Sequence, residues 1–198
     1  MRIVIVGQKW LGRVVLDVCL QRGHRVLQVV APLGDSLAAA AAVHSIPVLS
    51  ARRLEAEHVP RCDLLIAAHA HAYIGASARS MAALGCAGYH PSLLPLHRGR
   101  DAVRWTIHMR EPVAGGTLYW MDDGVDSGPI IYQDWCIVRP DDTAAALWKR
   151  DLGPMGVRMF ADLLEACESG GVPAGQEQLA ALATWEPAFD PKPLKSIN

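Results

Sequence analysis

Over the first ninety residues, short apolar runs take turns with stretches that have helical periodicity. The runs are rich in β-branched residues and predict strands covered on both faces; they are residues 2–6, 25–30, 46–49, 63–67 and 85–89. The stretches between them predict helices at residues 10–22, 35–44 and 74–84. Asp35 or Ser36 is the expected N-cap of the second helix. This order is typical of an α/β fold built on a doubly wound, mainly parallel sheet.

The pattern changes after residue 90. Residues 90–100 are rich in proline, glycine and basic side chains and form a loop too long for a simple connection. Beyond it we expect a helix with Asp101 as N-cap, two strands and a long helix weakened by Gly153 and Pro154; their ranges are 101–110, 116–121, 130–138 and 143–168. We therefore expect one Rossmann-like catalytic domain over residues 1–170. Residues 171–198 would form a C-terminal tail, packed on the surface or partly mobile.

Composition narrows the class of protein. The chain has 198 residues, of which 51% are hydrophobic and 20% charged, as in an ordinary globular domain. Its net charge of -1 gives no field that would attract nucleic acid or a membrane surface, and the sequence shows neither a membrane span nor a signal peptide. The five cysteines are scattered, which argues against a zinc site or disulfides. We expect a cytoplasmic protein with a small-molecule substrate; the oligomeric state stays open.

The glycines after the first strand do not form a dinucleotide site. Lys9 occupies the position of the second glycine of that motif, and Ala31 and Pro32 stand where an acidic residue would hold a ribose. The simpler interpretation is a tight strand-to-helix turn, although a helix N-terminus there could still bind an anion.

Two polar segments carry candidate chemistry. His90 directly follows a predicted strand, where open α/β sheets bind ligands. Asp126 lies in a turn with two further aspartates, just before a second apolar strand. A lone histidine is more often structural, and Asp122 and Asp123 could simply be turn residues. A carboxylate beside a histidine, however, can orient water, stabilise an imidazolium or relay a proton.

These segments resemble the formyltransferase family, which includes the glycinamide ribonucleotide and methionyl-tRNA formyltransferases. The likeness rests on the run His-Pro-Ser-Leu-Leu-Pro at 90–95, on Arg-Gly at 98–99, on Gly-Gly-Thr at 115–117 and on Asp-Ser-Gly-Pro at 126–129. It is greatest to the hydrolase domain of 10-formyltetrahydrofolate dehydrogenase and covers roughly residues 1–170. The resemblance implies that His90 and Asp126 are catalytic, that 10-formyltetrahydrofolate is the cofactor and that the Leu94–Pro95 bond is cis.

One position departs from the family. The family's third catalytic residue, an asparagine, would stand at Gly88. Loss of one such donor typically costs about 100-fold in rate, and we expect water in place of the missing amide. The hydrolase domain named above also lacks this asparagine.

The resemblance also implies a folate site built mainly from backbone. Its two walls would be Ala70, His71, Ala72, Tyr73 and Ile74 on one side and Asp122, Asp123, Gly124 and Val125 on the other. Weaker candidates for contact with substrate are Gly88, Ser92 and Arg98. The basic residues of 97–110 either attract an anionic group or form a solvated helix face. We expect no metal, because His69 and His71 lack a third ligand.

Three functions remain open. The first is transfer of formyl from 10-formyltetrahydrofolate to an amine of an unidentified small acceptor. The second is hydrolysis of the same compound to formate and tetrahydrofolate, and the third is a folate-binding protein without turnover. The turn at residues 7–10 does not look like the phosphate site of a glycinamide ribonucleotide enzyme, and the chain lacks the positive charge that binding to tRNA favours.

Overall fold

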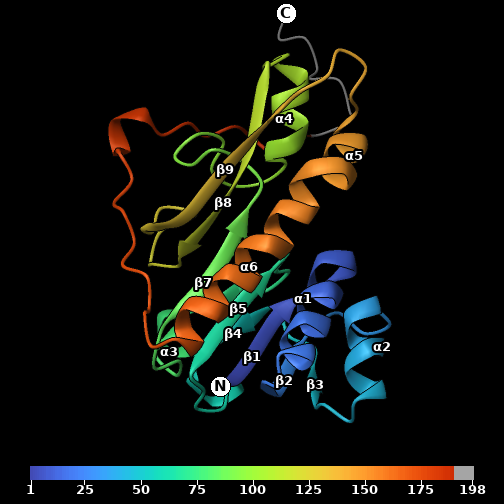
Figure 1. Cartoon of the computed structure of the whole chain (residues 1–198), viewed down its shortest axis with the longest axis vertical. Coiled ribbons are helices and arrows are strands. Elements are labelled where there is room, and N and C mark those ends of the chain that lie inside the picture. The colour runs from blue at the N-terminus through green and yellow to red at the C-terminus, as the bar shows by residue number, and fades with distance from the viewer. Residues whose placement is uncertain (190–198) are drawn as a thin grey trace, which may run out of the picture.

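A seven-stranded sheet forms the centre of the computed structural model, which describes residues 1–189 (Figure 1). The strand order is β3-β2-β1-β5-β7-β8-β9. The strands are β1 (Arg2–Gly7), β2 (Arg25–Val30), β3 (Val48–Leu49), β5 (Leu64–Ala68), β7 (Cys86–His90), β8 (Val113–Trp120) and β9 (Ile130–Ile137). The first five are parallel, while β8 and β9 each run antiparallel to the strand before them. The predicted doubly wound, mainly parallel sheet is confirmed.

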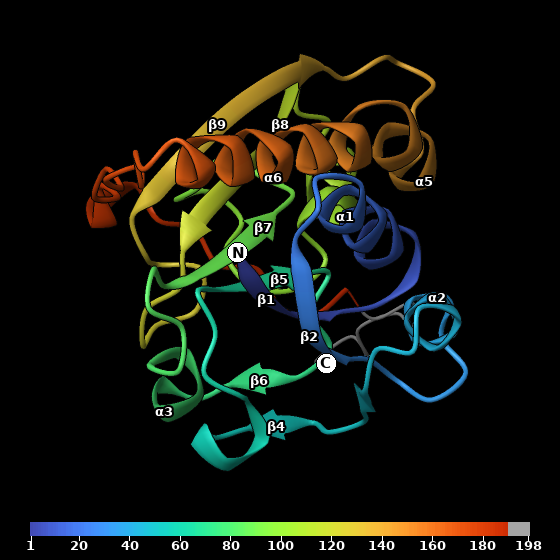
Figure 2. The ribbon, with the colours of Figure 1, turned by 60° about the horizontal axis from the view of Figure 1, so that its bottom comes forward.

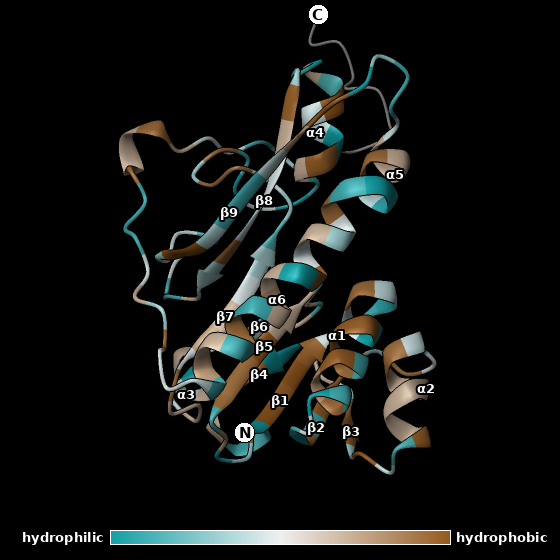
Figure 3. Cartoon of the chain, viewed as in Figure 1, coloured by the Kyte–Doolittle hydropathy of each residue, from teal (hydrophilic) through white to brown (hydrophobic). Residues whose placement is uncertain are grey.

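The two faces of the sheet have different covers. Helices α1 (Lys9–Gln21), α2 (Ser36–Val43) and α6 (Gly153–Glu168) pack on one face over alternate strand residues such as Ile3 and Ile5 (Figure 2). Val4 and Val6 point to the other face, which is covered by a small second sheet and a short helix. These are β4 (Arg53–Leu54), β6 (Tyr73–Ile74) and α3 (Ala76–Arg79). Because both faces are covered, β5 is apolar along its whole length and β1 is apolar after the exposed Arg2 (Figure 3).

One predicted helix is wrong in extent, and a second has the predicted extent with a change of helix type inside it. The helix predicted at 74–84 shrinks to α3, because the backbone on either side bonds elsewhere: Gly75 N donates to Leu54 O, and Cys62 N to Met81 O. The helix predicted at 143–168 is divided into α5 (Ala144–Leu147), a π-helical turn (Trp148–Leu152) and α6. Pro154 lies at the start of α6, where the missing N–H of proline is tolerated.

The two predicted N-caps behave differently. The carboxylate of Asp35 accepts from Leu37 N at 2.8 Å and caps α2. Asp101 precedes α4 (Ala102–His108) in a left-handed conformation, and its side chain accepts from Phe189 N instead of capping the helix.

Residues 171–189 run back along β9 and the loop that follows β7 (Figure 1). Ile130 and Gln176 exchange two backbone hydrogen bonds of 2.8 Å, and Trp120 Nε1 donates to Pro173 O. Arg98 N donates to Thr184 O. The rest of the predicted tail, residues 190–198, lies outside the described residues. Over residues 1–189 no helix has the length and hydrophobicity to cross a membrane.

Candidate active site

His90 and Asp126 meet at the end of the sheet. His90 is the last residue of β7, and Asp126 lies in the turn between β8 and β9. The distance from His90 Nδ1 to Asp126 Oδ2 is 3.5 Å, with only 8% and 15% of the two side chains exposed. The predicted proximity is confirmed. The separation exceeds an ordinary N–H···O hydrogen bond, so the two side chains lie next to each other without a direct hydrogen bond.

The loop at 90–100 fixes the orientation of the His90 ring. Nε2 lies 2.7 Å from the carbonyl oxygen of His97. A carbonyl only accepts, so Nε2 carries a hydrogen. A neutral ring would then turn the lone pair of Nδ1 toward the Asp126 carboxylate, whereas an imidazolium turns an N–H toward it. Nδ1 is therefore the ring nitrogen that faces the Asp126 carboxylate.

Three groups hold Asp126. Gly99 N donates to Oδ2 at 2.7 Å, and the Tyr119 hydroxyl donates to Oδ1 at 2.6 Å. The Asp126 backbone has a φ of 51°, and its carbonyl accepts from Gln178 Nε2 at 3.0 Å. Burial, together with the charge of Asp126, raises the pKa of the Tyr119 hydroxyl well above its ordinary value, so the phenol stays a donor. Each carboxylate oxygen thus has a defined partner.

The loop that carries His90 is itself fastened to β8. Thr117 Oγ1 donates to Ser92 O and accepts from Leu94 N. The predicted cis bond between Leu94 and Pro95 is confirmed. The candidate Ser92 is buried, and its hydroxyl donates to Leu96 O; the guanidinium of Arg98 is also buried and donates to Gln178 Oε1 at 2.8 Å. The polar groups of both residues are therefore used inside the protein.

Gly88 lies in the interior of β7, opposite Tyr119 of β8. A Cβ placed on Gly88 would lie 3.2 Å from Cε1 and from Cζ of Tyr119, which is closer than side chains normally pack. The ring of Tyr119 therefore fills the space beside Gly88, where we expected water.

Arg79 joins the two predicted folate walls. Residues 70–74 follow β5, and residues 122–125 belong to the turn after β8. Arg79 Nη1 donates to Ile74 O at 2.7 Å, and its Nη2 pairs with the Asp123 carboxylate. Asp122 turns inward to accept from Gly124 N and Ser127 Oγ, which shapes the turn. The structure therefore places the two walls side by side.

His71 is the polar side chain of these walls that lacks a partner. Both of its ring nitrogens are buried, and neither has a hydrogen-bond partner among the described residues. Buried polar groups are normally paired. A heterocyclic ligand with donors and acceptors on its edge, such as a pterin, would satisfy His71, so these residues fit a folate.

The start of α1 already holds a carboxylate. Both oxygens of Asp35 accept from Lys9 N, at 2.9 and 3.0 Å. The possible anion site at this helix N-terminus is thus filled by the protein itself. Nearby, burial and the charge of Lys9 lower the pKa of the His69 imidazole, and the ring lies 6.0 Å from that of Trp148.

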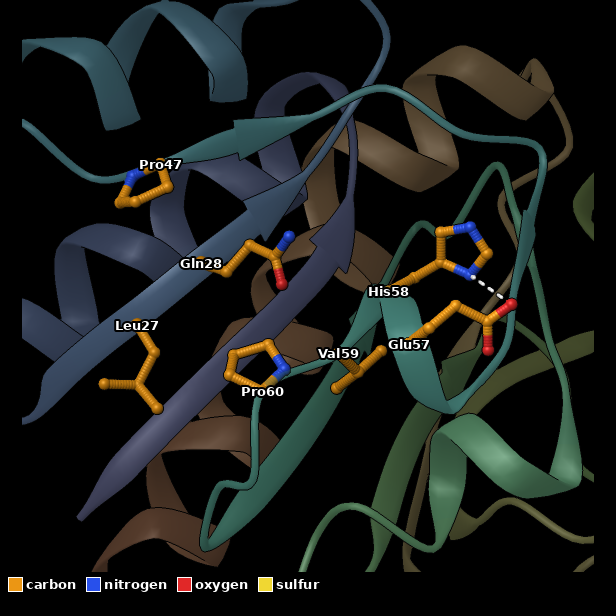
Figure 4. A pocket seen from close by; sticks show the side chains of 7 residues that line it. All are labelled: Leu27, Gln28, Pro47, Glu57, His58, Val59 and Pro60. Atoms are coloured by element: carbon orange, nitrogen blue, oxygen red, sulfur yellow. Dashed lines mark ion pairs between the residues drawn. The ribbon is translucent and has the colours of Figure 1, made fainter.

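We also searched residues 1–189 for metal ligands and for hollows away from His90 and Asp126. Over residues 1–189 no three His, Cys, Asp or Glu side chains gather closely enough to hold a metal ion. A hollow of about 390 Å³ lies beside β2 (Figure 4). It is lined by Leu27, Gln28, Pro47, Glu57, His58, Val59 and Pro60 and includes none of the predicted site residues. A second hollow, of about 270 Å³, lies behind the loop at 90–100 and includes Ser92 and His97.

Sequence reasoning missed three residues that shape this site: Tyr119, Arg79 and Gln178. Tyr119 lies opposite Gly88 through a strand register that the sequence pattern does not give. Arg79 and Gln178 gave no signal, because Asp123 and Asp126, with which they bond, lie 44 and 52 residues away in the sequence.

Comparison with known proteins supports one family. The Formyl transferase model matches residues 1–154. The mitochondrial 10-formyltetrahydrofolate dehydrogenase of Mus musculus is 32% identical over 87% of this chain, and the match spans 20% of the mouse protein. The chain thus covers about a fifth of the length of that curated relative.

Solved structures show the same fold. Phosphoribosylglycinamide formyltransferase from Bacillus halodurans superposes with a TM-score of 0.71 at 22% identity, over 85% of this chain and 98% of that one. An N-formyltransferase from Helicobacter canadensis, solved in complex with folinic acid and dTDP-3-aminofucose, gives 0.75 at 17% identity, over 93% of this chain and 70% of that one.

Proposed function

Since this chain belongs to the formyl transferase family, we propose that it transfers the formyl group of 10-formyltetrahydrofolate to an amine of a small acceptor, with His90 and Asp126 as its catalytic residues. The observation that carries the proposal is the buried pair itself. Nδ1 of His90 faces Oδ2 of Asp126 at 3.5 Å, while Nε2 is engaged by the His97 carbonyl.

The two residues supply opposite halves of the chemistry. 10-Formyltetrahydrofolate would supply a formyl carbon to which the acceptor nitrogen adds. Its bond to N10 would then break, with N10 taking up the proton that the acceptor nitrogen gives up, so that tetrahydrofolate and the formylated amine are the products. Negative charge develops on the formyl oxygen as the acceptor attacks, and Nδ1–H of His90 is placed to hold that charge. The carboxylate of Asp126 accepts the proton that the attacking nitrogen must lose, directly or through one water.

We place the folate between residues 70–74 and 122–125. Arg79 ties these walls together, and the unpaired nitrogens of His71 offer a donor and an acceptor to the pterin edge. The folinic acid in the Helicobacter canadensis complex supports this choice of ligand class.

We infer an acceptor without a phosphate at the start of α1. The carboxylate of Asp35 accepts from Lys9 N and takes the position that an anion would need. The cysteines are all free, which suits a reducing compartment such as the cytoplasm.

Hydrolysis is the second candidate, favoured by Gly88. Because position 88 of β7 is glycine, no side-chain amide lies beside His90 at this position, so stabilisation of the formyl oxygen rests on the histidine. The sequence likeness to a 10-formyltetrahydrofolate dehydrogenase points in the same direction.

One experiment separates these functions. The purified chain is incubated with 10-formyltetrahydrofolate, without an amine and then with a panel of sugar amines and amino acids, and formate and tetrahydrofolate are measured. We expect tetrahydrofolate to form faster with one class of amine and without matching formate. Equal amounts of formate and tetrahydrofolate under all conditions would establish the hydrolase, and absence of both would contradict each enzymatic function.

A further inference from the structure

We propose that Tyr119 is a positioning residue of this site, whose hydroxyl holds the Asp126 carboxylate in the orientation that faces His90, and that Gly88 is the residue that admits it. The expected effect of Tyr119 on turnover rests on the proposed function, whereas its effect on the orientation of Asp126 rests on the geometry alone.

The first step is the strand pairing. Gly88 and Tyr119 are directly opposite in the antiparallel pair β7–β8, so a side chain at 88 would share the face on which the Tyr119 ring lies. An added Cβ would approach Cε1 and Cζ of the ring to 3.2 Å. Met121 Cγ would lie equally close, at 3.2 Å, so a residue larger than glycine would force the Tyr119 ring or the Met121 side chain to shift by a few tenths of an ångström.

The second step is the direction of the hydroxyl. The phenol reaches past Gly88 and donates to Asp126 Oδ1 at 2.6 Å. Only 4% of Tyr119 is exposed, so water does not compete for this bond. A short bond to a carboxylate in a buried place is among the stronger hydrogen bonds in proteins.

The third step is the freedom of the carboxylate without that bond. The terminal torsion of an aspartate is broad. Gly99 N fixes Oδ2, and the backbone is held by Gln178, but neither contact fixes Oδ1. The Tyr119 hydroxyl is the group among the described residues that bonds to Oδ1. It therefore sets the plane of the carboxylate and, with it, the direction in which Oδ2 faces His90.

The test removes the hydroxyl and keeps the ring. We expect Tyr119→Phe to lower kcat about 10- to 100-fold, the cost of one hydrogen bond to a charged group. KM for 10-formyltetrahydrofolate should stay within about twofold, because the folate walls are untouched. Tyr89→Phe is the matched control. That buried hydroxyl donates to Leu152 O and does not touch Asp126, so its loss should change the midpoint of unfolding and leave kcat unchanged.

A second variant reaches the same contact from the facing strand. Gly88→Ala adds the crowding Cβ, so kcat should fall again. In Gly88→Ala/Tyr119→Phe the alanine should cost no more than about twofold further, because the hydroxyl it acts through is already gone. If Tyr119→Phe does not fold, the single variant Gly88→Ala decides the question, since the inference then requires its kcat to fall.

Several outcomes overturn the inference. The first is an unchanged kcat in Tyr119→Phe. The second is a change of KM in Tyr119→Phe without a change of kcat. The third is a fall of kcat in Tyr89→Phe equal to that in Tyr119→Phe. If the parent chain shows no turnover at all, the proposed function fails, and crystal structures of the two tyrosine variants decide this inference alone. It stands if the distance from Asp126 Oδ2 to His90 Nδ1 changes by more than about 0.5 Å in Tyr119→Phe only, and it fails if the distance is unchanged.

Discussion

Nδ1 of His90 and Oδ2 of Asp126 lie 3.5 Å apart, although one residue ends β7 and the other lies in the turn after the next strand, β8. The gap is too long for a good direct hydrogen bond, yet both atoms can be reached by one reacting group that lies beside them.

We expect His90→Ala and Asp126→Asn each to lower formyl turnover by at least about 100-fold, because each removes one half of this donor–acceptor pair. Turnover is measured as tetrahydrofolate formed, with circular dichroism as the check on folding. Asp134→Asn makes the same chemical change on β9, where Asp134 pairs with Arg158, and should retain activity. Near-normal turnover in His90→Ala would place the reaction elsewhere.

Arg79→Met should weaken the binding of folinic acid about tenfold, because the guanidinium that joins the two folate walls is lost while the aliphatic stem remains. Calorimetry gives the dissociation constant. Arg13→Met removes a surface ion pair with Asp17 on α1 and serves as the control. Equal affinities for the two variants would show that the ligand does not depend on this link.

Gln178→Leu should destabilise the protein by about 1–3 kcal/mol, because it leaves the buried guanidinium of Arg98 without its acceptor. It also removes the donor to the carbonyls of Asp126 and Gly128, so turnover should fall. Urea denaturation measures the first effect. The exposed side chain of Gln176 offers a control, since Gln176→Leu should change stability by less than about 0.5 kcal/mol. A stable, fully active Gln178→Leu variant would contradict this role for residues 171–189.

The buried tyrosines predict a loss of stability at high pH. Burial raises the pKa of both Tyr119 and Tyr89, whereas an unfolded tyrosine ionises near pH 10. Because the folded pKa is the higher one, the stability linked to each phenol is fully present below about pH 10 and is lost as the pH rises above that value. Phenolate absorbance should therefore appear for these two residues only as the protein unfolds. Tyr119→Phe should remove one phenolate from that step, and ionisation of Tyr119 in the folded protein would refute this picture.

The main sheet could be predicted because its central strands, such as β1 and β5, are apolar on both faces. The helix expected at 74–84 is shorter because Gly75 N donates to Leu54 O of β4 and Met81 O accepts from Cys62 N, and no local pattern reveals these partners. His90 and Asp126 could be named from motif and resemblance. The space beside Gly88 could not be interpreted, because its occupant, Tyr119, depends on the register between two strands.

The two residues of the pair are oriented by different kinds of group: His90 by the backbone carbonyl of His97 and Asp126 by the side chain of Tyr119. Every amino acid carries that oxygen, so a substitution at position 97 replaces the side chain and keeps the acceptor that orients His90. The hydroxyl that orients Asp126 belongs to a side chain and disappears in a single step from Tyr119 to phenylalanine. The orientation of His90 is therefore less sensitive to single substitutions than the orientation of Asp126. The aspartate end is where related chains, or a directed-evolution library, can most readily change the rate without rebuilding the fold.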